Sequence, residues 1–235
     1  MRFDSPLRTN REQGSFLFIG HYAVGFASKR FAPRSSLAAL IAAPLLLDLL
    51  WPIFLLLGIE HARIQPDNPP FLQLDLYDYP WSHSLLMSLV WSVLYGGTYW
   101  LFTRYPRGGI VIGLGVFSHW LFDFIVHRPD MPLYPGGPKV GLGIWYSTEG
   151  TIAIESIIFI VGMAIYLQTT RALDRIGTIS LGAFVVLLLV LYVLSIVGPP
   201  PPDWKTIAWA ANATWLFVLW AGWFDAHRRT TDQSS

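Results

Sequence analysis

The sequence contains no cysteine and few charged residues. Without thiols, the chain cannot form a disulfide, a thiolate metal site, an iron–sulfur cluster or an active site with a cysteine nucleophile. Only 13% of its 235 residues are charged, whereas soluble domains carry about 25%. The formal net charge of +1 gives no electrostatic basis for binding nucleic acid. These shortages argue against a soluble domain and against a nucleic-acid partner.

Hydrophobic residues take the place of the missing charge. They make up 53% of the chain, which also has 11 tryptophans and 10 tyrosines, residue types that gather at membrane interfaces. We therefore predict an all-α fold, a polytopic transmembrane helical bundle that forms a single integral-membrane domain over residues 1–235. Its parts are a polar arm (1–13), a half that carries the polar membrane residues (14–170), and two apolar packing spans with a short polar tail (171–235).

Six hydrophobic runs are long enough to cross a bilayer. We predict spans at 35–58, 82–102, 108–126, 148–168, 176–197 and 206–224, the first of them capped by Ser35 or Ser36. Residues 16–28 are apolar but too short to cross comfortably, which predicts a short membrane-embedded helix; a full crossing would give seven spans. A cleavable signal peptide has a similar layout, but His21 interrupts its apolar core and many spans follow.

The basic residues of the connecting segments are unevenly shared between the two sides of the predicted bundle. Cytoplasmic connections normally hold the excess of lysine and arginine. One set holds Lys29, Arg30, Arg34, Arg104, Arg107, Arg171, Arg175, Arg228 and Arg229, whereas the other holds only Arg63, Arg128, Lys139 and Lys205. The first set and the C-terminus are therefore predicted to be cytoplasmic.

The segment at 115–130 combines an apolar character with three regularly spaced polar residues. His119, Asp123 and His127 lie at i, i+4 and i+8, so on a helix they project from one face within an arc of about 80°. Two imidazoles beside a carboxylate form a partial ligand shell for zinc or a similar divalent metal. A polar seam that bonds to a neighbouring helix is the simpler alternative. Gly109 and Gly113 precede the stripe at a spacing that lets helices approach closely.

Asp48, His83 and Glu155 also fall within or at the ends of predicted spans. A central aspartate costs roughly 2.5–3.5 kcal/mol on insertion scales, so these acids need a compensating partner. Few basic residues lie at that depth, and a divalent cation would neutralise the acids while taking the histidines as neutral donors. The helical rise places His119 and His21 deeper than the other histidines. One compact site therefore requires helix tilt or helix breaks.

His83 and Glu155 each have more than one interpretation. Ser82 is predicted to cap a helix that begins at His83, where the helix dipole favours a neutral, metal-binding imidazole. A capping histidine that faces water is the alternative. Glu155 is a second ligand, a general base or a packed, protonated acid, and the last is favoured because nothing is spaced with it at i±4. His61 and His227 are interpreted as solvated side chains.

Four fragments in order resemble the YdjM-like family of bacterial inner-membrane proteins, regarded as metal-dependent hydrolases. They are Gly20-His21, Leu45-Leu-Leu-Asp48, Trp81-Ser-His83-Ser84-Leu85 and Gly115-Val-Phe-Ser-His119-Trp-Leu-Phe-Asp123. The family pattern is Gly-His, Pro-Asp-x-Asp, His-Arg-x-x-Thr-His-Ser and Ser-His-x-x-x-Asp. The resemblance covers roughly residues 20–135, which leaves the last two spans outside it.

The resemblance implies a set of metal ligands, with two departures from the family pattern. Asp48 alone remains of the paired aspartates, and Asp78 stands where the family's first histidine is expected. Aspartate can replace histidine as a zinc ligand, so the change either retunes the site or marks a member with a changed or lost activity. The implied ligands are His21, Asp48, His83, His119 and Asp123, with His127 as an addition that would compensate.

The leading hypothesis is an integral inner-membrane, metal-dependent hydrolase with its site near the outer half of the membrane. The cofactor is expected to be zinc, with manganese or iron as alternatives. A lipid or lipid-linked ester or phosphoester is the expected substrate, and membrane lipids are the expected partners. Glu149, Glu155 and Asp78 are the candidate general bases.

Two other functions use the same residues. A cation- or proton-coupled transporter would be favoured by discontinuous helices around Pro52 and Gly96-Gly97. A non-catalytic membrane partner would use the His/Asp seam only for packing, so substitutions there would lower stability without changing any metal content.

Overall fold

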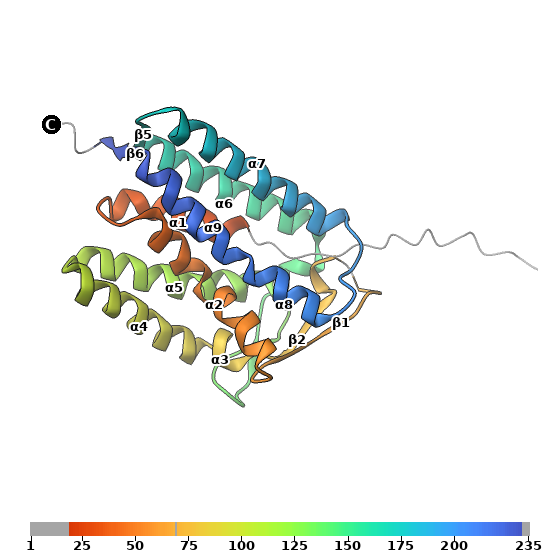
Figure 1. Cartoon of the computed structure of the whole chain (residues 1–235). Coiled ribbons are helices and arrows are strands. Elements are labelled where there is room, and N and C mark those ends of the chain that lie inside the picture. Colours follow the sequence, from red (N-terminus) through yellow and green to blue (C-terminus); the bar gives the residue numbers. More distant parts are fainter. Residues whose placement is uncertain (1–18, 69, 232–235) are drawn as a thin grey trace, which may run out of the picture.

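The computed structural model describes residues 19–68 and 70–231, and within them the chain is an all-α polytopic bundle (Figure 1). It contains six helical segments long and apolar enough to cross a membrane. This confirms the predicted fold class. The spans are α2 (Leu37–Leu56), α4 (Leu85–Thr103), α5 (Pro106–Val126), α6 (Thr148–Thr169), α7 (Arg175–Val197), and α8 (Trp204–Asn212) together with α9 (Thr214–Ala226).

The first two helices begin the bundle. The short helix α1 (Ile19–Phe31) has 13 residues, and the predicted polar arm at 1–13 lies outside the described residues. Ser36 caps α2 as predicted, because its side chain accepts a hydrogen bond from Ala39 N at 3.3 Å. Helix α2 then runs unbroken through Pro44 and Pro52.

The predicted start of the span at 82–102 is wrong in one detail. A separate helix, α3 (Pro80–His83), comes first, and the hydroxyl of Ser84 caps α4 at 3.2 Å. Proline at the first helical position starts α3 early because its φ is already helical. The Ser82 hydroxyl is bonded to Glu60 instead of acting as a cap. His83 therefore ends α3, and the helix-dipole argument for its neutral form does not apply.

Helices α4 and α5 pack closely through glycines, as the small-residue spacing predicted. A Cβ added at Gly109 would lie 2.7 Å from the carbonyl oxygen of Gly96, and one at Gly113 would lie 3.2 Å from that of Ser92. Only glycine lets the two backbones come this near. The pair holds the polar end of α5 in a fixed position.

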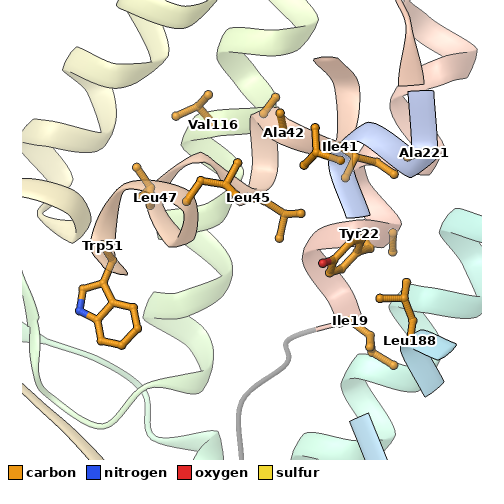
Figure 2. Close-up of a cluster of buried hydrophobic side chains, with 14 of the residues drawn as sticks. Ile19, Tyr22, Ile41, Ala42, Leu45, Leu47, Trp51, Val116, Leu188 and Ala221 are labelled. Atoms are coloured by element: carbon orange, nitrogen blue, oxygen red, sulfur yellow. The ribbon is translucent and has the colours of Figure 1, made fainter. Parts of the chain in front are cut away.

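The hydrophobic core is centred on α2. Figure 2 shows Ile41 and Leu45 of α2 with Tyr22 of α1, Val116 of α5 and Leu188 of α7. In the most apolar stretch of α2, 61% of residues are buried, against 17% in α4. Apolar side chains also cover the outer faces of α4 and α7, which suits contact with lipid.

Short strands and 3-10 turns close the two ends of the bundle (Figure 1). At the end that carries α3, β1 (His61–Ile64) pairs antiparallel with β2 (Leu74–Asp78), next to η1 (Pro70–Leu72), β3 (Met131–Pro132), β4 (Lys139–Val140) and η2 (Ile144–Tyr146). We call this set of segments, residues 57–68, 70–79 and 127–147, the loop lobe. At the other end β5 (Thr170–Ala172) pairs with β6 (Arg228–Thr230). Which end is cytoplasmic stays a prediction from the charge bias.

Candidate metal centre

The polar stripe of α5 is present, but only two of its three residues are helical. His119 Nε2 lies 3.0 Å from Asp123 Oδ2, one turn further along the helix. Helix α5 ends at Val126, and His127 is an extended C-cap residue. Pro129 accounts for the end of the helix, because a proline disfavours helical conformation in the residue before it, here Arg128. His127 still reaches back, with its Nε2 3.8 Å from Asp123 Oδ2.

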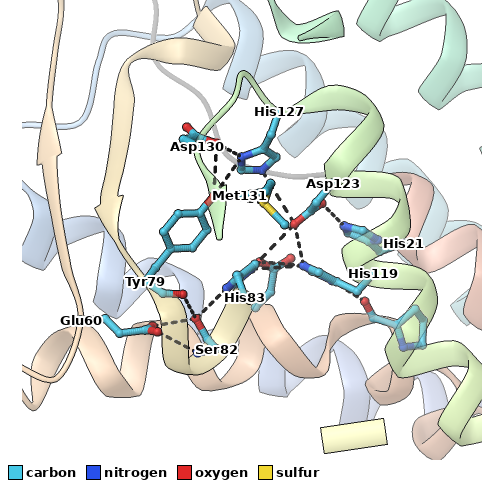
Figure 3. Close-up of polar contacts among 12 residues, drawn as sticks. His21, Glu60, Tyr79, Ser82, His83, His119, Asp123, His127, Asp130 and Met131 are labelled. Atoms are coloured by element: carbon cyan, nitrogen blue, oxygen red, sulfur yellow. Dashed lines mark hydrogen bonds and ion pairs between the residues drawn. The ribbon is translucent and has the colours of Figure 1, made fainter. Parts of the chain in front are cut away.

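Two other elements bring ligand-type atoms to this stripe (Figure 3). His83, at the end of α3, places its Nε2 3.2 Å from His119 Nε2. From α2, Asp48 Oδ1 lies 3.5 Å from His83 Nε2 and 3.8 Å from His119 Nε2. His83 Nε2 is 3.9 Å from Asp123 Oδ2. Ligand-type atoms of His83, His119 and Asp123 thus lie within 4.8 Å of one another, and Asp48 Oδ1 adjoins the two imidazoles.

His21 of α1 lies against the same group. Its ring stacks on that of His119, with centroids 3.9 Å apart and planes 11° apart. Its Nε2 is 3.2 Å from Asp123 Oδ1. Ligand-type atoms of His21, Asp48 and His119 also lie within 4.8 Å of one another. The structure therefore brings together all six residues that were predicted as ligands. The helical rise had indicated that one compact site would need helix tilt or helix breaks, and the break between α3 and α4 is such a break.

The hydrogen bonds on the far side of two histidine rings determine which nitrogen carries the proton. His119 Nδ1 donates to the carbonyl oxygen of Pro44 at 2.7 Å. His83 Nδ1 is 2.6 Å from Ser82 Oγ, and that hydroxyl donates its own proton to Glu60 Oε2 at 2.7 Å. The Ser82 oxygen is therefore the acceptor for His83. In its neutral form each ring is therefore protonated at Nδ1, and its Nε2 lone pair faces the carboxylates and the other imidazole.

His127 is oriented in the same way by the loop lobe. Its Nδ1 donates to Asp130 Oδ1 at 3.0 Å. Burial works to raise the pKa of Asp130, but the His127 hydrogen bond and the Arg128 guanidinium hold that pKa below its ordinary value. Burial raises the pKa of Tyr79 well above its ordinary value, so its hydroxyl stays protonated and donates to Asp130 at 3.2 Å. Arg128 also bonds to Asp75, which links the orientation of His127 to strand β2.

The donor set fits a divalent metal ion. Neighbouring lone pairs repel, and the nitrogens of His83 and His119 face each other at 3.2 Å. Within residues 19–68 and 70–231, no lysine or arginine forms an ion pair with Asp48 or Asp123. The two carboxylates balance a 2+ charge. The separations of 3.0–3.9 Å bracket the edge of about 3.3 Å of a tetrahedron whose ligands lie about 2.0–2.1 Å from zinc.

A cavity of about 540 Å³ adjoins this group. Asp48 has 42% of its side chain exposed because it faces this cavity. The polar residues of the lining include His21, Asp48, His83, Asp123, His127 and Glu155, and the remaining lining is mostly apolar. The ligand-type atoms are therefore accessible from inside the bundle.

The three candidate bases have different surroundings. Glu155 lines the cavity. It also accepts a hydrogen bond at 3.1 Å from the backbone N–H of Ile19, the first residue of α1 and two residues before His21. Asp78 instead bonds to His61 Nδ1 at 2.8 Å on the half-exposed side of β2. Glu149 is exposed in the first turn of α6. Neither Asp78 nor Glu149 lines the cavity.

Several orienting residues were not found from the sequence. Glu60 lies 22 residues before Ser82, a separation that carries no local signal. Tyr79 likewise follows no periodic pattern with the residues it contacts. Asp130 was within reach of sequence reasoning, because it lies three residues after His127.

Comparison with known proteins gives a single family. The family model described as YdjM inner membrane protein matches residues 80–199, slightly more than half of the chain. That region runs from α3 through α7 and contains His83, His119 and Asp123, whereas His21 and Asp48 precede it. It begins later and extends further than the resemblance at 20–135. No curated protein and no solved structure matches the chain.

Proposed function

The chain belongs to the YdjM inner membrane protein family, and from that premise we propose that it is a membrane-bound, metal-dependent hydrolase. The observation that carries the proposal is the convergence of two histidine lone pairs and two carboxylates at the cavity wall. His83, His119, Asp48 and Asp123 would hold the ion, with zinc favoured by this donor set over manganese or iron. When bound, the ion acts as a Lewis acid that polarises an ester or phosphoester and activates water.

The surrounding residues keep these four side chains in position. Ser82, backed by Glu60, fixes the ring of His83. His21 donates to Asp123 Oδ1, which leaves Oδ2 directed toward the imidazoles. Such outer partners fix the orientation and the proton position of metal ligands. They account for the buried polar residues around the site without assigning them to the reaction.

Glu155 is our candidate for the general base, because it is the one of the three proposed acids that lines the cavity. Glu155→Gln keeps an oxygen for the Ile19 N–H but cannot take up a proton. We expect turnover to fall by roughly 10²–10⁴-fold with the metal retained. Glu149→Gln, on the exposed start of the same helix, is the matched control and should leave turnover unchanged. Equal turnover in both variants would remove Glu155 from the reaction.

Elemental analysis of detergent-purified, dialysed protein tests the metal site. Wild type and His61→Ala should retain stoichiometric metal, since His61 lies on β1 outside the group. His119→Ala and Asp123→Ala should each lose it together with hydrolysis of ester or phosphoester lipids. Stoichiometric metal in both of these variants would overturn the proposal.

The transport hypothesis has less support. It expected helix breaks around Pro52 and Gly96-Gly97, but α2 and α4 run continuously through these positions. The hypothesis of a purely structural seam expects donors to face acceptors. With neutral imidazoles, acceptors instead face one another at His83 and His119, an arrangement that a bound cation would satisfy.

A further inference from the structure

The cavity beside the candidate metal centre is lined by acids and histidines of the site and otherwise mostly by apolar side chains. We propose that it is a binding chamber for the hydrocarbon chain of an amphiphilic substrate, whose ester or phosphoester head lies at the His/Asp group. The assignment of the head rests on the proposed function. The assignment of the chain rests on the cavity walls.

One wall comes from the two C-terminal spans, which the sequence had assigned only to packing. Leu191 and Leu194 of α7 line the cavity. The last span also lines the cavity and is interrupted at one residue, since α8 ends at Asn212 and α9 begins at Thr214. The residues at this break are small: Ala210, Ala211, Ala213 and Thr214 all line the cavity. Small side chains on the last span thus leave room at this part of the cavity wall.

The other wall joins α2 to the loop lobe. Leu45 and Trp51 of α2 line it together with Phe71, Leu74 and Leu76. The chamber thus extends from the metal centre along apolar side chains of five segments of the chain. Its volume of about 540 Å³ lies within the range of roughly 300–1,000 Å³ for small-molecule sites.

The mostly apolar lining of the cavity favours one class of ligand. Each methylene that leaves water for an apolar site contributes about 0.8 kcal/mol, whereas a polar group buried there without a partner is penalised. A wholly polar substrate would satisfy the His/Asp end and be disfavoured along the remaining wall. An amphiphile satisfies both, and the surrounding membrane is a source of such molecules.

Photolabelling of the full-length protein tests the chamber directly. The probe is dodecyl phosphate with a diazirine at the end of its chain, and labelled peptides are identified by mass spectrometry. We expect label on the inward side of α7 and on residues 210–217. Ala211→Phe should reduce this labelling about tenfold, the effect of excluding about two methylenes. Val193→Phe, on the 73% exposed outward face of α7, is the matched control and should change nothing.

A second measurement needs no variant. Alkyl phosphates of increasing chain length should compete with the probe about fourfold better per methylene, and the gain should stop once the chamber is filled. Label spread evenly over lipid-facing residues, or competition independent of chain length, would overturn the chamber.

The two proposals can fail separately. Chamber labelling in a protein that holds no metal would leave the chamber standing and remove the hydrolase. Metal-dependent hydrolysis with chamber labelling unaffected by Ala211→Phe would do the reverse. Metal content measured in Ala211→Phe and Val193→Phe shows that both variants are folded around the site.

Discussion

Two of the buried polar clusters in the described part of the chain are built in opposite ways. One lies near the end of the bundle that carries β5 and β6, where Lys29 Nζ donates to Asp225 Oδ2 at 2.6 Å. Asp225 also accepts from Leu37 N at 3.0 Å and from the Tyr166 hydroxyl at 2.9 Å. In this Lys29 cluster a positive charge meets a negative one, and donors meet acceptors. It is closed and requires nothing from outside.

The second cluster, the His/Asp cluster, consists of Asp48, His83, His119 and Asp123 at the other end of the bundle. Its donors and acceptors are not matched to one another in this way. Its donor groups, such as His119 Nδ1 and His83 Nδ1, form hydrogen bonds with oxygen atoms outside the cluster. When the imidazoles are neutral, its inner atoms are acceptors that face one another beside a cavity. Buried polar groups in a membrane protein are costly, so both clusters need an explanation. The comparison teaches that the direction of the hydrogen bonds says more than burial does. A cluster whose donors meet its own acceptors joins helices, whereas converging acceptors are the arrangement that our proposed cation would satisfy.

The largest effect on stability is expected from breaking the Lys29 cluster. Lys29→Met leaves the Asp225 carboxylate buried without its charge partner, which should destabilise the protein by about 3–5 kcal/mol. Unfolding in detergent measures the loss, while the metal content per folded chain should not change. Combining Lys29→Met with Asp225→Asn removes both charges and keeps an acceptor for Tyr166, so much of the stability should return. A loss of metal in the single variant would contradict the separation of the two clusters.

Removing the metal is expected to destabilise the protein through the His/Asp cluster and to leave the Lys29 cluster unchanged. A ligand that binds only the folded state adds about 2.7 kcal/mol at one hundred times its Kd. Chelation should therefore lower the unfolding temperature of wild type and of Lys29→Met, because both keep the His/Asp cluster. His119→Ala should not respond. A response of equal size in His119→Ala would show that the chelator acts elsewhere.

Sequence reasoning succeeded where the signal was local. The spacing of His119 and Asp123 placed them on one face of α5, and Ser36 caps α2 as predicted. The glycine spacing likewise predicted the close contact between α4 and α5. Each of these features depends on residues within about two helical turns. The cost of polar residues in predicted spans had already singled out Asp48 and His83. The family resemblance then joined these two and His21 to α5, which local spacing alone does not do.

Other features depend on tertiary contacts or on prolines whose effect was misjudged. Pro80 began a helix before Ser82, and Pro129 ended α5 before His127. The capping of α1 by Glu155 joins residues 136 positions apart. The break between α8 and α9 falls in Ala210–Thr214, which contains no proline or glycine to mark it. Packing decides the last two of these features, and packing has no short-range pattern.

A smaller effect is expected from the outer hydrogen bonds of the His/Asp cluster. Ser82→Ala removes the oxygen that accepts the His83 proton and leaves Glu60 with one donor fewer. Metal affinity should fall by about 10–100-fold, as for other outer partners of metal ligands. Competition with a chelator of known affinity measures it. Ser88→Ala is the control, since the Ser88 hydroxyl is bonded to the Leu85 carbonyl within α4. Equal losses in both variants would mean that the effect is general destabilisation.

The smallest effect is expected at Asp78, although the family pattern has a histidine at this position. Asp78 is bonded to His61, and both side chains are about half exposed on the loop lobe. Exposed ion pairs contribute roughly 0–1 kcal/mol, so Asp78→Asn should change stability by no more than that. Metal content and metal affinity should equal those of wild type, because Asp78 does not line the cavity. A loss of metal in Asp78→Asn would mean that the loop lobe closes over the His/Asp cluster and brings Asp78 to the ion. The position would then keep the ligand role of the family's histidine, and the His/Asp cluster would include the loop lobe.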